Sequence, residues 1–502
     1  MDTLIFNLIF LYSADINIIT KVFTKVGDGI INMKDNFITF GVIIGTRGIF
    51  NPMLARNDRK ILLKTLNSLG YNTIILSEDE TASGSIETYQ DAKKCASLFK
   101  ENQDKIDGIL VILPNFGDEL AIVNSIALSG LHVPVLVQAS CDEIDKVSVS
   151  ERRDSFCGKI SVCNNLIQYG IPFTNTILHT EDVDSNEFKA DLDKFARVCR
   201  IIRGLKDARL GAIGTRPAAF QTMRFSEKVL QYFGITVIPI DLSDVLAVAN
   251  KIDSAKTALK ADEIRNYGQI PSRINNESIM RQARFSLAVE EFIEKNELIA
   301  GAIQCWDSLE YNYGCAPCLT MSMLSERGIP FACELDICGA LSMLCLQLAS
   351  GNPPALLDWN NNYGDNLNQC ACTHCSNFPR SFLKNDIEIS ELDILGATIG
   401  KESCFGAIKG HVAPGNFTFF RVSTDDRKGY LKSYIGEGKF LDAPFPMDGG
   451  IAVAEVKNLQ KVMNYICNEG FEHHVAMARG NVADILEEAA KYLQWKADNL
   501  QK

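Results

Sequence analysis

Residues 331–379 read FACELDICGALSMLCLQLASGNPPALLDWNNNYGDNLNQCACTHCSNFP, and two kinds of sequence pattern meet in this stretch. Before it, apolar strands alternate with helical segments. Beyond about residue 380, apolar and polar residues alternate with period two between Gly, Pro and Asp turns. The first pattern is typical of doubly wound parallel sheets, and the second of antiparallel, barrel-like domains. The chain is therefore expected to be an α/β protein that ends in a β-rich domain.

The same stretch carries two acids in apolar or Asn-rich surroundings, Glu334 on an expected strand and Asp358, followed by His374. A buried carboxylate costs several kcal/mol unless another group compensates its charge. Two such acids and a histidine this close together indicate a divalent metal held by hard ligands.

The first part of the chain contains two α/β units of similar design. Both place Gly-Thr-Arg directly after an apolar strand, at 45–47 in VIIGTRGIF and at 214–216 in LGAIGTRPAAF. This resembles an internal duplication of a Rossmann-like unit. Neither segment is GxGxxG, so a dinucleotide site is not supported.

These patterns predict four parts of the chain. Residues 1–32 lack a basic region and a cleavage site, so they are expected to be a dispensable extension rather than a signal peptide. An N-terminal α/β domain is expected over 33–177, a second α/β domain over 178–355, and a C-terminal mainly antiparallel domain over 356–502.

The composition of the chain limits the kinds of molecule it can be expected to bind. The chain has 502 residues, 46% hydrophobic and 22% charged, with a net charge of −12. An acidic chain of this kind disfavours nucleic acid or an anionic membrane as a partner. Its 16 cysteines are scattered through apolar runs, which favours reduced, buried thiols and a cytoplasmic location.

The thiols offer an alternative metal site. Cys315 and Cys318, with Cys372 and Cys375, give two CxxC pairs. Their separation, 372 − 318 = 54 residues, is far longer than in a zinc ribbon, so a structural zinc is the less favoured interpretation. A redox pair at the first motif is equally disfavoured, because no thioredoxin-like context surrounds it.

Several polar residues follow expected strands and could contact a ligand. Gln304 and Trp306 suit a sugar, since an amide bonds hydroxyls and an indole faces C–H groups. Arg47 could bind an anionic or polyhydroxyl ligand, or serve only the turn, and Arg216 could bind an anion or start a helix. Asn360 could orient Asp358, bond sugar hydroxyls or belong to a turn.

The C-terminal segment contains an adjacent histidine pair, His473 and His474. Adjacent side chains on a strand point to opposite faces, so only one of the pair is expected to face a site.

Twelve segments together resemble one known family. They include GTRGIFNP, LPNFGDE, GTRPAAFQTMRFSEK, IQCWDSLEYNYG, ACELDICGA, DWNNNYGDN, HCSNFP and GFEHHVA, in this order. The chain after Met33 is similar to the L-fucose/L-arabinose isomerase superfamily, and most similar to its fucose isomerase-like branch. Each motif alone is weak, but the ordered set is specific for the superfamily and not for one sugar.

The resemblance implies two α/β domains, a C-terminal domain, a homo-oligomer (a hexamer) and Mn²⁺-dependent interconversion of aldoses and ketoses. It places Glu334 and Asp358 at the two carboxylate metal ligands of the family, and His474 at its C-terminal histidine ligand. From the chemistry of isomerisation, which needs one carboxylate for the C–H proton and one for the hydroxyl protons, Glu334 and Asp358 are also expected to be the catalytic acids. His374 matches a histidine ligand of the arabinose branch. Gln304 matches a substrate-binding Gln loosely.

Two functions remain open from the sequence. The first is a metal-dependent isomerase that moves a proton between C1 and C2 of a sugar, either fucose- or arabinose-like or a modified hexose such as a sulfosugar. The alternative is a non-catalytic sugar-binding or sensor protein on the same scaffold.

Overall fold

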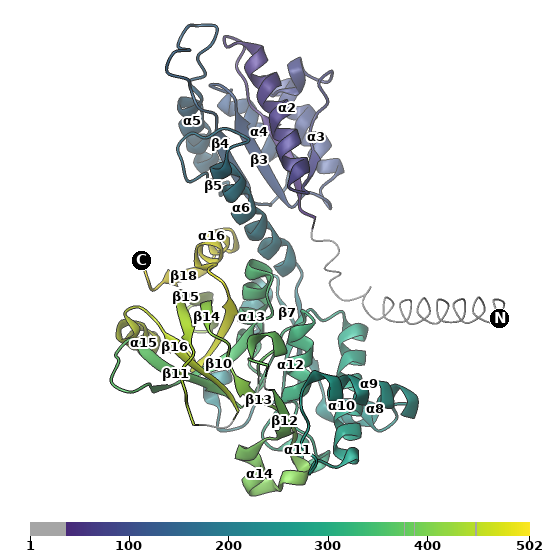
Figure 1. Ribbon diagram of the computed structural model, residues 1–502. Coiled ribbons are helices and arrows are strands. Elements are labelled where there is room, and N and C mark those ends of the chain that lie inside the picture. The colour runs from purple at the N-terminus through teal and green to yellow at the C-terminus, as the bar shows by residue number, and fades with distance from the viewer. Residues whose placement is uncertain (1–36, 376, 386, 447–448) are drawn as a thin grey trace, which may run out of the picture. The chain divides into compact units, whose positions relative to one another are not determined.

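The computed structural model describes residues 37–375, 377–385, 387–446 and 449–502 (Figure 1). The extension predicted at 1–32 lies outside these residues. The described chain forms two compact units, one of Asn36–Lys206 with Val482–Ala497 and the other of Asp207–Asn481 with Asp498–Lys502. The domain boundaries predicted from the sequence stay predictions.

The N-terminal unit is built on a five-stranded parallel sheet in the order β2-β1-β3-β4-β5. Its strands are β1 (Thr39–Ile44), β2 (Asn72–Ile74), β3 (Gly108–Leu113), β4 (Val135–Ala139) and β5 (Thr174–Asn175). Its helices are α2 (Pro52–Ser68), α3 (Tyr89–Glu101), α4 (Glu119–Ser129), α5 (Ser155–Gln168) and α6 (Asn186–Leu205). Every residue of GILVIL in β3 is buried, as expected for a central parallel strand covered on both faces.

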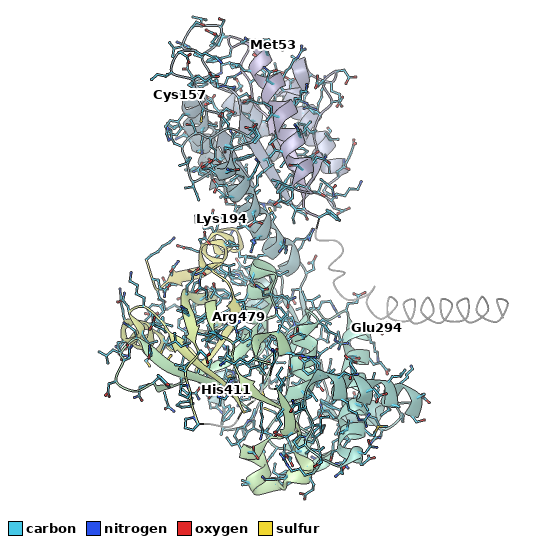
Figure 2. The ribbon with its side chains drawn as sticks, in the orientation of Figure 1. Met53, Cys157, Lys194, Glu294, His411 and Arg479 are labelled. Atoms are coloured by element: carbon cyan, nitrogen blue, oxygen red, sulfur yellow. The ribbon has the colours of Figure 1, made fainter. Side chains whose placement is uncertain are left out.

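A helix from the other end of the chain, α16 (Ala483–Leu493), completes this unit. Lys194 of α6, labelled in Figure 2, forms an ion pair of 2.8 Å with Asp484 of α16. Thr174 Oγ donates to Glu488 at 2.7 Å. The unit therefore depends on residues about 300 positions apart in the sequence.

The second unit begins with a four-stranded parallel sheet in the order β7-β6-β8-β9. Its strands are β6 (Arg209–Ile213), β7 (Thr236–Ile240), β8 (Ala300–Ile303) and β9 (Phe331–Ala332). Its helices are α7 (Glu227–Tyr232), α8 (Leu242–Ala249), α9 (Ser254–Tyr267), α10 (Asn276–Asn296), α11 (Ser308–Asn312), α12 (Cys318–Glu326) and α13 (Ile337–Ser350). The two Gly-Thr-Arg segments directly follow β1 and β6, so the predicted repeat of this arrangement is confirmed.

The C-terminal part of this unit is a closed barrel of six antiparallel strands. They are β10 (Ala355–Asn362), β11 (Gln369–His374), β14 (Gly415–Asp425), β15 (Tyr430–Leu441), β16 (Gly450–Glu455) and β17 (His474–Arg479). The order β16-β11-β10-β17-β14-β15 closes through pairing of β15 with β16. The predicted fold class is thus confirmed.

The remaining elements extend this framework. β12 (Glu388–Glu391) pairs with β13 (Phe405–His411), which joins β16 in parallel, and α14 (Asp393–Ile399), α15 (Leu459–Asn468) and β18 (Lys496–Asn499) complete the chain. Short 3-10 turns lie at Ala82–Gly84, Gln221–Met223, Arg380–Phe382 and Lys401–Ser403. Among the described helices, none has the length and apolar character needed to cross a bilayer.

Aromatic side chains fill the barrel. Phe417 stacks on Phe440 with ring centroids 4.1 Å apart, and both are fully buried. Gly436 lies against Phe419, where an added Cβ would come within 2.2 Å of the ring. Only glycine therefore fits this close approach of strand and ring.

Helix α13 is buried over nearly its whole length and packs against β8 and β9 of the sheet and β14 and β17 of the barrel. Its sequence ICGALSMLCLQLAS is apolar on all sides, as expected for a helix enclosed by protein. The loop that starts α13 is therefore held between the sheet and the barrel.

Glu310 of α11 is a buried carboxyl whose two oxygens have no hydrogen-bond partner among the described residues. Burial, reinforced by Asp307, raises the pKa of Glu310 to about 7. The folded state therefore holds this proton at pH values where the unfolded chain has lost it, and stability falls as pH rises from about 4.5 to about 7.

We expect Glu310→Gln to remove this pH dependence, because the amide cannot ionise. Wild type should lose about 3 kcal/mol more unfolding free energy than the variant between pH 4.5 and 7, at about 1.4 kcal/mol per pKa unit. Urea midpoints measured across this range test it. The exposed Glu291→Gln is the control and should retain the wild-type slope. Equal slopes in wild type and Glu310→Gln would contradict the prediction.

Candidate metal and sugar site

The carboxyl end of β9 turns sharply before α13. Glu334 and Leu335 both have left-handed backbone conformations, with φ of 59° and 57°. Such conformations are uncommon and unfavourable for residues with a Cβ. The strand ends at Ala332, so the expectation that Glu334 lies on a strand was wrong. The tight turn is what brings Glu334 and Asp336 to the same histidine.

Three neighbouring barrel strands supply the other groups. Asp358 of β10 pairs in register with His474 of β17 on one side and with Thr373 of β11 on the other. His374 is the next residue of β11, and its ring centroid lies 5.1 Å from that of His474. Antiparallel register thus unites residues 116 positions apart, since 474 − 358 = 116.

The ligand-type atoms of these residues converge. His474 Nε2 lies 3.4 Å from Glu334 Oε2 and 3.5 Å from Asp358 Oδ1. One ligand atom from each of Glu334, His374 and His474 lies within 4.8 Å of the other two. The same holds for a second group, Asp358, His473 and His474. We call Glu334, Asp358, His374 and His474 the metal-candidate group.

One atom of each member is buried without a hydrogen-bond partner among the described residues. These atoms are Glu334 Oε2, Asp358 Oδ1, His374 Nδ1 and His474 Nε2. Each unpaired polar atom buried in this way costs free energy. A divalent cation would satisfy the atoms of either three-residue group, because carboxylate oxygen and imidazole nitrogen are ordinary ligands for such ions. The residues therefore fit a metal.

A buried network orients His474. Its Nδ1 lies 2.8 Å from Asp336 Oδ2, so the carboxylate fixes the ring and leaves Nε2 facing the cluster. Asp336 also receives two hydrogen bonds from the fully buried Arg421, at 2.5 and 3.0 Å. Arg421 Nε donates to Glu472 at 3.0 Å, and Glu472 accepts from Ser423 at 2.7 Å.

Burial and this network also set the protonation states of the site residues. Burial opposes ionisation of Asp336, but the Arg421 guanidinium and His474 hold its pKa well below the usual range. Burial opposes charging of His474 too, yet its hydrogen bond to Asp336 and the neighbouring Glu334 and Asp358 carboxylates raise its pKa to about 10. For His374, burial and the neighbouring His474 lower the pKa to about 3, so this ring stays neutral. Burial raises the pKa of Asp358.

The structure places both members of the histidine pair near Asp358. The sequence predicted that one would face the site and that the other would support it or be solvated, and the His473 side chain is 46% exposed. In the structure, both approach Asp358, with His473 Nε2 at 3.9 Å and His474 Nε2 at 3.5 Å from Oδ1. Strand β17 begins at His474, so strict strand alternation does not apply to His473.

The other predicted residues have local partners. Gln304, just after β8, accepts a hydrogen bond from the backbone N–H of Thr215 at 2.8 Å. Trp306 has a buried indole N–H without a partner among the described residues, and its ring meets Phe220 edge-on at 5.6 Å. Arg216 donates to the carbonyls of Pro217, Ala218 and Phe220.

Asn360 lies within β10, so the turn interpretation was wrong. Its Oδ1 accepts from the backbone N–H and the hydroxyl of Thr373, at 2.6 and 2.7 Å. This contact spans the irregular register between Trp359 and Asn361. Asn360 therefore fixes β10 to β11 directly beyond Asp358.

Arg47 belongs to the N-terminal unit, whereas the metal-candidate group lies wholly in the other unit. Its guanidinium donates to Gly117 O at 3.2 Å and to Glu119 at 2.5 Å, and it covers the ring of Phe116. The Arg47 guanidinium is thus held by two polar contacts and one aromatic ring within its own unit.

A cavity of about 1010 Å³ is lined by sequence neighbours of the metal-candidate group, although not by its members. Leu335, next to Glu334, and Glu472, two residues before His474, both line it. Its charged lining includes the cations Arg216, Arg224, Arg427 and Lys432 and the acids Glu227, Asp425 and Asp426. The cavity is large enough for a monosaccharide and mixed in charge.

Sequence reasoning missed Arg421 and Glu472. A signal for Arg421 was present, because it continues the period-two series Phe417, Phe419, Arg421 of a strand whose two aromatic members are fully buried. A charged residue at an inward position of such a strand needs a buried partner. Nothing local in the sequence indicates that the partner is Asp336.

Comparison with known proteins agrees with this architecture. The profile described as "Fucose/sulfoquinovose isomerase, N-terminal domain" matches residues 41–206, and "L-fucose isomerase, C-terminal domain" matches residues 372–501. The chain belongs to the fucose isomerase-like superfamily. It is a sugar isomerase of the aldose–ketose type, and this assignment favours the enzyme over the non-catalytic sugar-binding alternative.

Curated relatives of this isomerase carry one name, sulfoquinovose isomerase. The protein of Priestia aryabhattai is 27% identical over 394 residues, which is 78% of this chain and 84% of that relative. The protein of Alkalicoccus urumqiensis is 28% identical over 60% of this chain and 66% of its own length. The protein of a Clostridium species is 24% identical over 66% of this chain and 70% of its own length.

We expect Asp336→Asn to weaken Mn²⁺ binding by about 10–100-fold, because the His474 ring loses the carboxylate that fixes it. Calorimetric titration of Mn²⁺ into the folded variant measures the change. Since removing one partner of a buried ion pair costs about 3–5 kcal/mol, folding is checked by circular dichroism at the titration temperature. Asp365→Asn, at an exposed position, is the control. Unchanged affinity in folded Asp336→Asn would contradict the role given to this carboxylate.

Proposed function

We propose that this isomerase uses a divalent metal, Mn²⁺ in the first instance, to interconvert an aldose and its 2-ketose. The observation that carries the proposal is that Glu334, Asp358, His374 and His474 each hold a buried, unpaired ligand atom. They belong to two three-residue groups that share His474. Glu334, Asp358 and His474 would hold the ion, with His374 as a further ligand. When bound, the cation would polarise the sugar carbonyl as a Lewis acid.

The two carboxylates supply the proton transfers. Isomerisation requires removal of a proton from one of C1 and C2 and its delivery to the other, through an enediol. One of Glu334 and Asp358 moves this proton, and the other exchanges protons with the hydroxyl groups. Burial, which raises the pKa of Asp358, brings that carboxyl closer to the range where it can both accept and return a proton.

His474 and its partners act by positioning. Asp336 and Arg421 fix the imidazole ring, and neither needs to contact the sugar. The cavity lined by Leu335 and Glu472 would take the rest of the sugar, with Gln304, Trp306 and Asn360 as further contacts. The hexamer, the cytoplasmic location and these contact residues stay predictions.

The substrate we propose is a sulfonated hexose of the sulfoquinovose class. The support is the shared name of the four curated relatives. Four cations in the cavity lining could meet a sulfonate, although three acids beside them and Glu472 balance their charge.

Turnover of sulfoquinovose, fucose, arabinose and glucose with added Mn²⁺ tests this function. We expect activity only with metal, loss on chelation and recovery on adding Mn²⁺ back. For sulfoquinovose we expect kcat/KM at least tenfold above that for the neutral sugars, about 1.4 kcal/mol in transition-state binding. A preference for a neutral sugar would contradict the substrate, and full activity after complete metal removal would contradict the mechanism.

We expect Glu334→Gln and Asp358→Asn each to lower kcat by about 10²–10⁴-fold or more, because each amide can neither accept a proton nor bind the metal as a carboxylate. Both variants should remain folded, since the replaced side chains have no hydrogen-bonded oxygen at the cluster to lose. Circular dichroism and a coupled isomerase assay measure the two effects. Asp365→Asn should behave as wild type, and near-normal turnover in either site variant would refute its role.

A further inference from the structure

A group of buried thiols lies directly beside Glu334. Cys305 follows β8 and Cys333 follows β9, and these parallel strands are paired at Ala302 and Ala332. The residues after their carboxyl ends therefore emerge side by side, and the two sulfur atoms are 2.9 Å apart. Cys318, at the start of α12, interacts electrostatically with Cys333. We call Cys305, Cys318 and Cys333 the thiol cluster.

The thiol cluster reaches the isomerase site. Cys305 Sγ, Cys333 Sγ and a carboxylate oxygen of Glu334 lie within 4.8 Å of one another, and all three residues are buried. Glu334 therefore belongs to two groups of ligand atoms, one with His374 and His474 and one with the two thiols. Its Oε2 has no hydrogen-bond partner among the described residues, so it is available to either.

This grouping differs from the one that the sequence offered. The CxxC motifs pair Cys315 with Cys318 and Cys372 with Cys375. In the fold, Cys318 contacts Cys333, and Cys372 lies 3.7 Å from Cys370. The close thiols thus come from the ends of neighbouring strands and not from the motifs.

We propose that Cys305, Cys333 and Glu334 form a second metal site for thiophilic divalent cations such as Zn²⁺ and Cd²⁺. Thiolates favour such ions, whereas oxygen and imidazole ligands also suit Mn²⁺. Binding replaces the two thiol protons, which leave to solvent, so no oxidant is needed. Two thiolates at about 2.3 Å from one tetrahedral ion are about 3.8 Å apart, so the pair opens by about 1 Å through side-chain rotation. Cys318 is the nearest further thiol ligand.

A metal ion bound at this second site should affect isomerase activity, an inference that rests on the proposed function. A carboxylate drawn toward the thiols is lost to His474 and Asp358. Thiophilic cations should therefore inhibit the isomerase, because they take a carboxylate that the Mn²⁺ site needs.

Cadmium binding to the full-length, reduced, Mn²⁺-loaded protein tests the site without reference to activity. The ultraviolet charge-transfer band of cadmium thiolates reports the equivalents bound. The Cys305→Ser/Cys333→Ser variant should bind one equivalent fewer than wild type. The matched control is Cys370→Ser/Cys372→Ser, which removes another buried close pair that forms no such group with Glu334. It should retain that equivalent. Equal stoichiometry in wild type and the Cys305/Cys333 variant overturns the proposal.

Inhibition provides the second readout. The Cys305→Ser/Cys333→Ser variant should keep its basal turnover and need at least tenfold more Cd²⁺ for half-inhibition. Inhibition that a chelator reverses supports the metal site. Inhibition that only a thiol reductant reverses indicates a disulfide and overturns it, as does equal sensitivity of variant and wild type. If the double variant does not fold, Cys305→Ala replaces it in both measurements. Absence of turnover on every sugar would contradict the proposed function, and the stoichiometry would still decide the site.

Discussion

The hydrogen-bonded pair of Asp336 and His474 joins the parts of the larger unit. Asp336 accepts from the backbone N–H of Gly339 and so caps α13, while its other oxygen lies 2.8 Å from His474 of the barrel. One carboxylate thus links the loop after β9, the start of α13 and the first residue of β17. The position of Glu334, two residues earlier in the same loop, follows from this anchor.

Such an anchor is costly, and the surrounding residues offset the cost. Asp336 and Arg421 are each about 1% exposed, so both lose almost all of their hydration. Breaking a buried pair is far more destabilising than forming it is stabilising. The arrangement is completed by Glu472, which accepts from Arg421 and from Ser423. A network of this kind contributes less to net stability than to holding His474 in one orientation.

Glu334 is placed between two kinds of ligand chemistry. On one side are the imidazole of His474 and the carboxylate of Asp358, and on the other are the thiols of Cys305 and Cys333. The left-handed turn at Glu334 and Leu335 makes this position available, because an extended continuation of β9 would carry the carboxylate away from the barrel. The same geometry that assembles the metal-candidate group therefore exposes it to thiophilic ions.

The sequence by itself determined the fold class and the residues of the metal-candidate group. Apolar runs such as GILVIL and the period-two strands beyond residue 380 specify parallel and antiparallel sheets through side-chain burial alone. Glu334, Asp358 and His374 could be singled out because acids and histidines are conspicuous in apolar surroundings, and His474 was predicted from the resemblance of its segment to the isomerase family. Only the tertiary structure decided their partners. The pairing of Asp358 with His474, the contact of Asp336 with Arg421, and the approach of Cys305 to Cys333 each join residues separated by 28 or more positions. Strand register and the turn after β9 fix these contacts, and no local propensity encodes either of them.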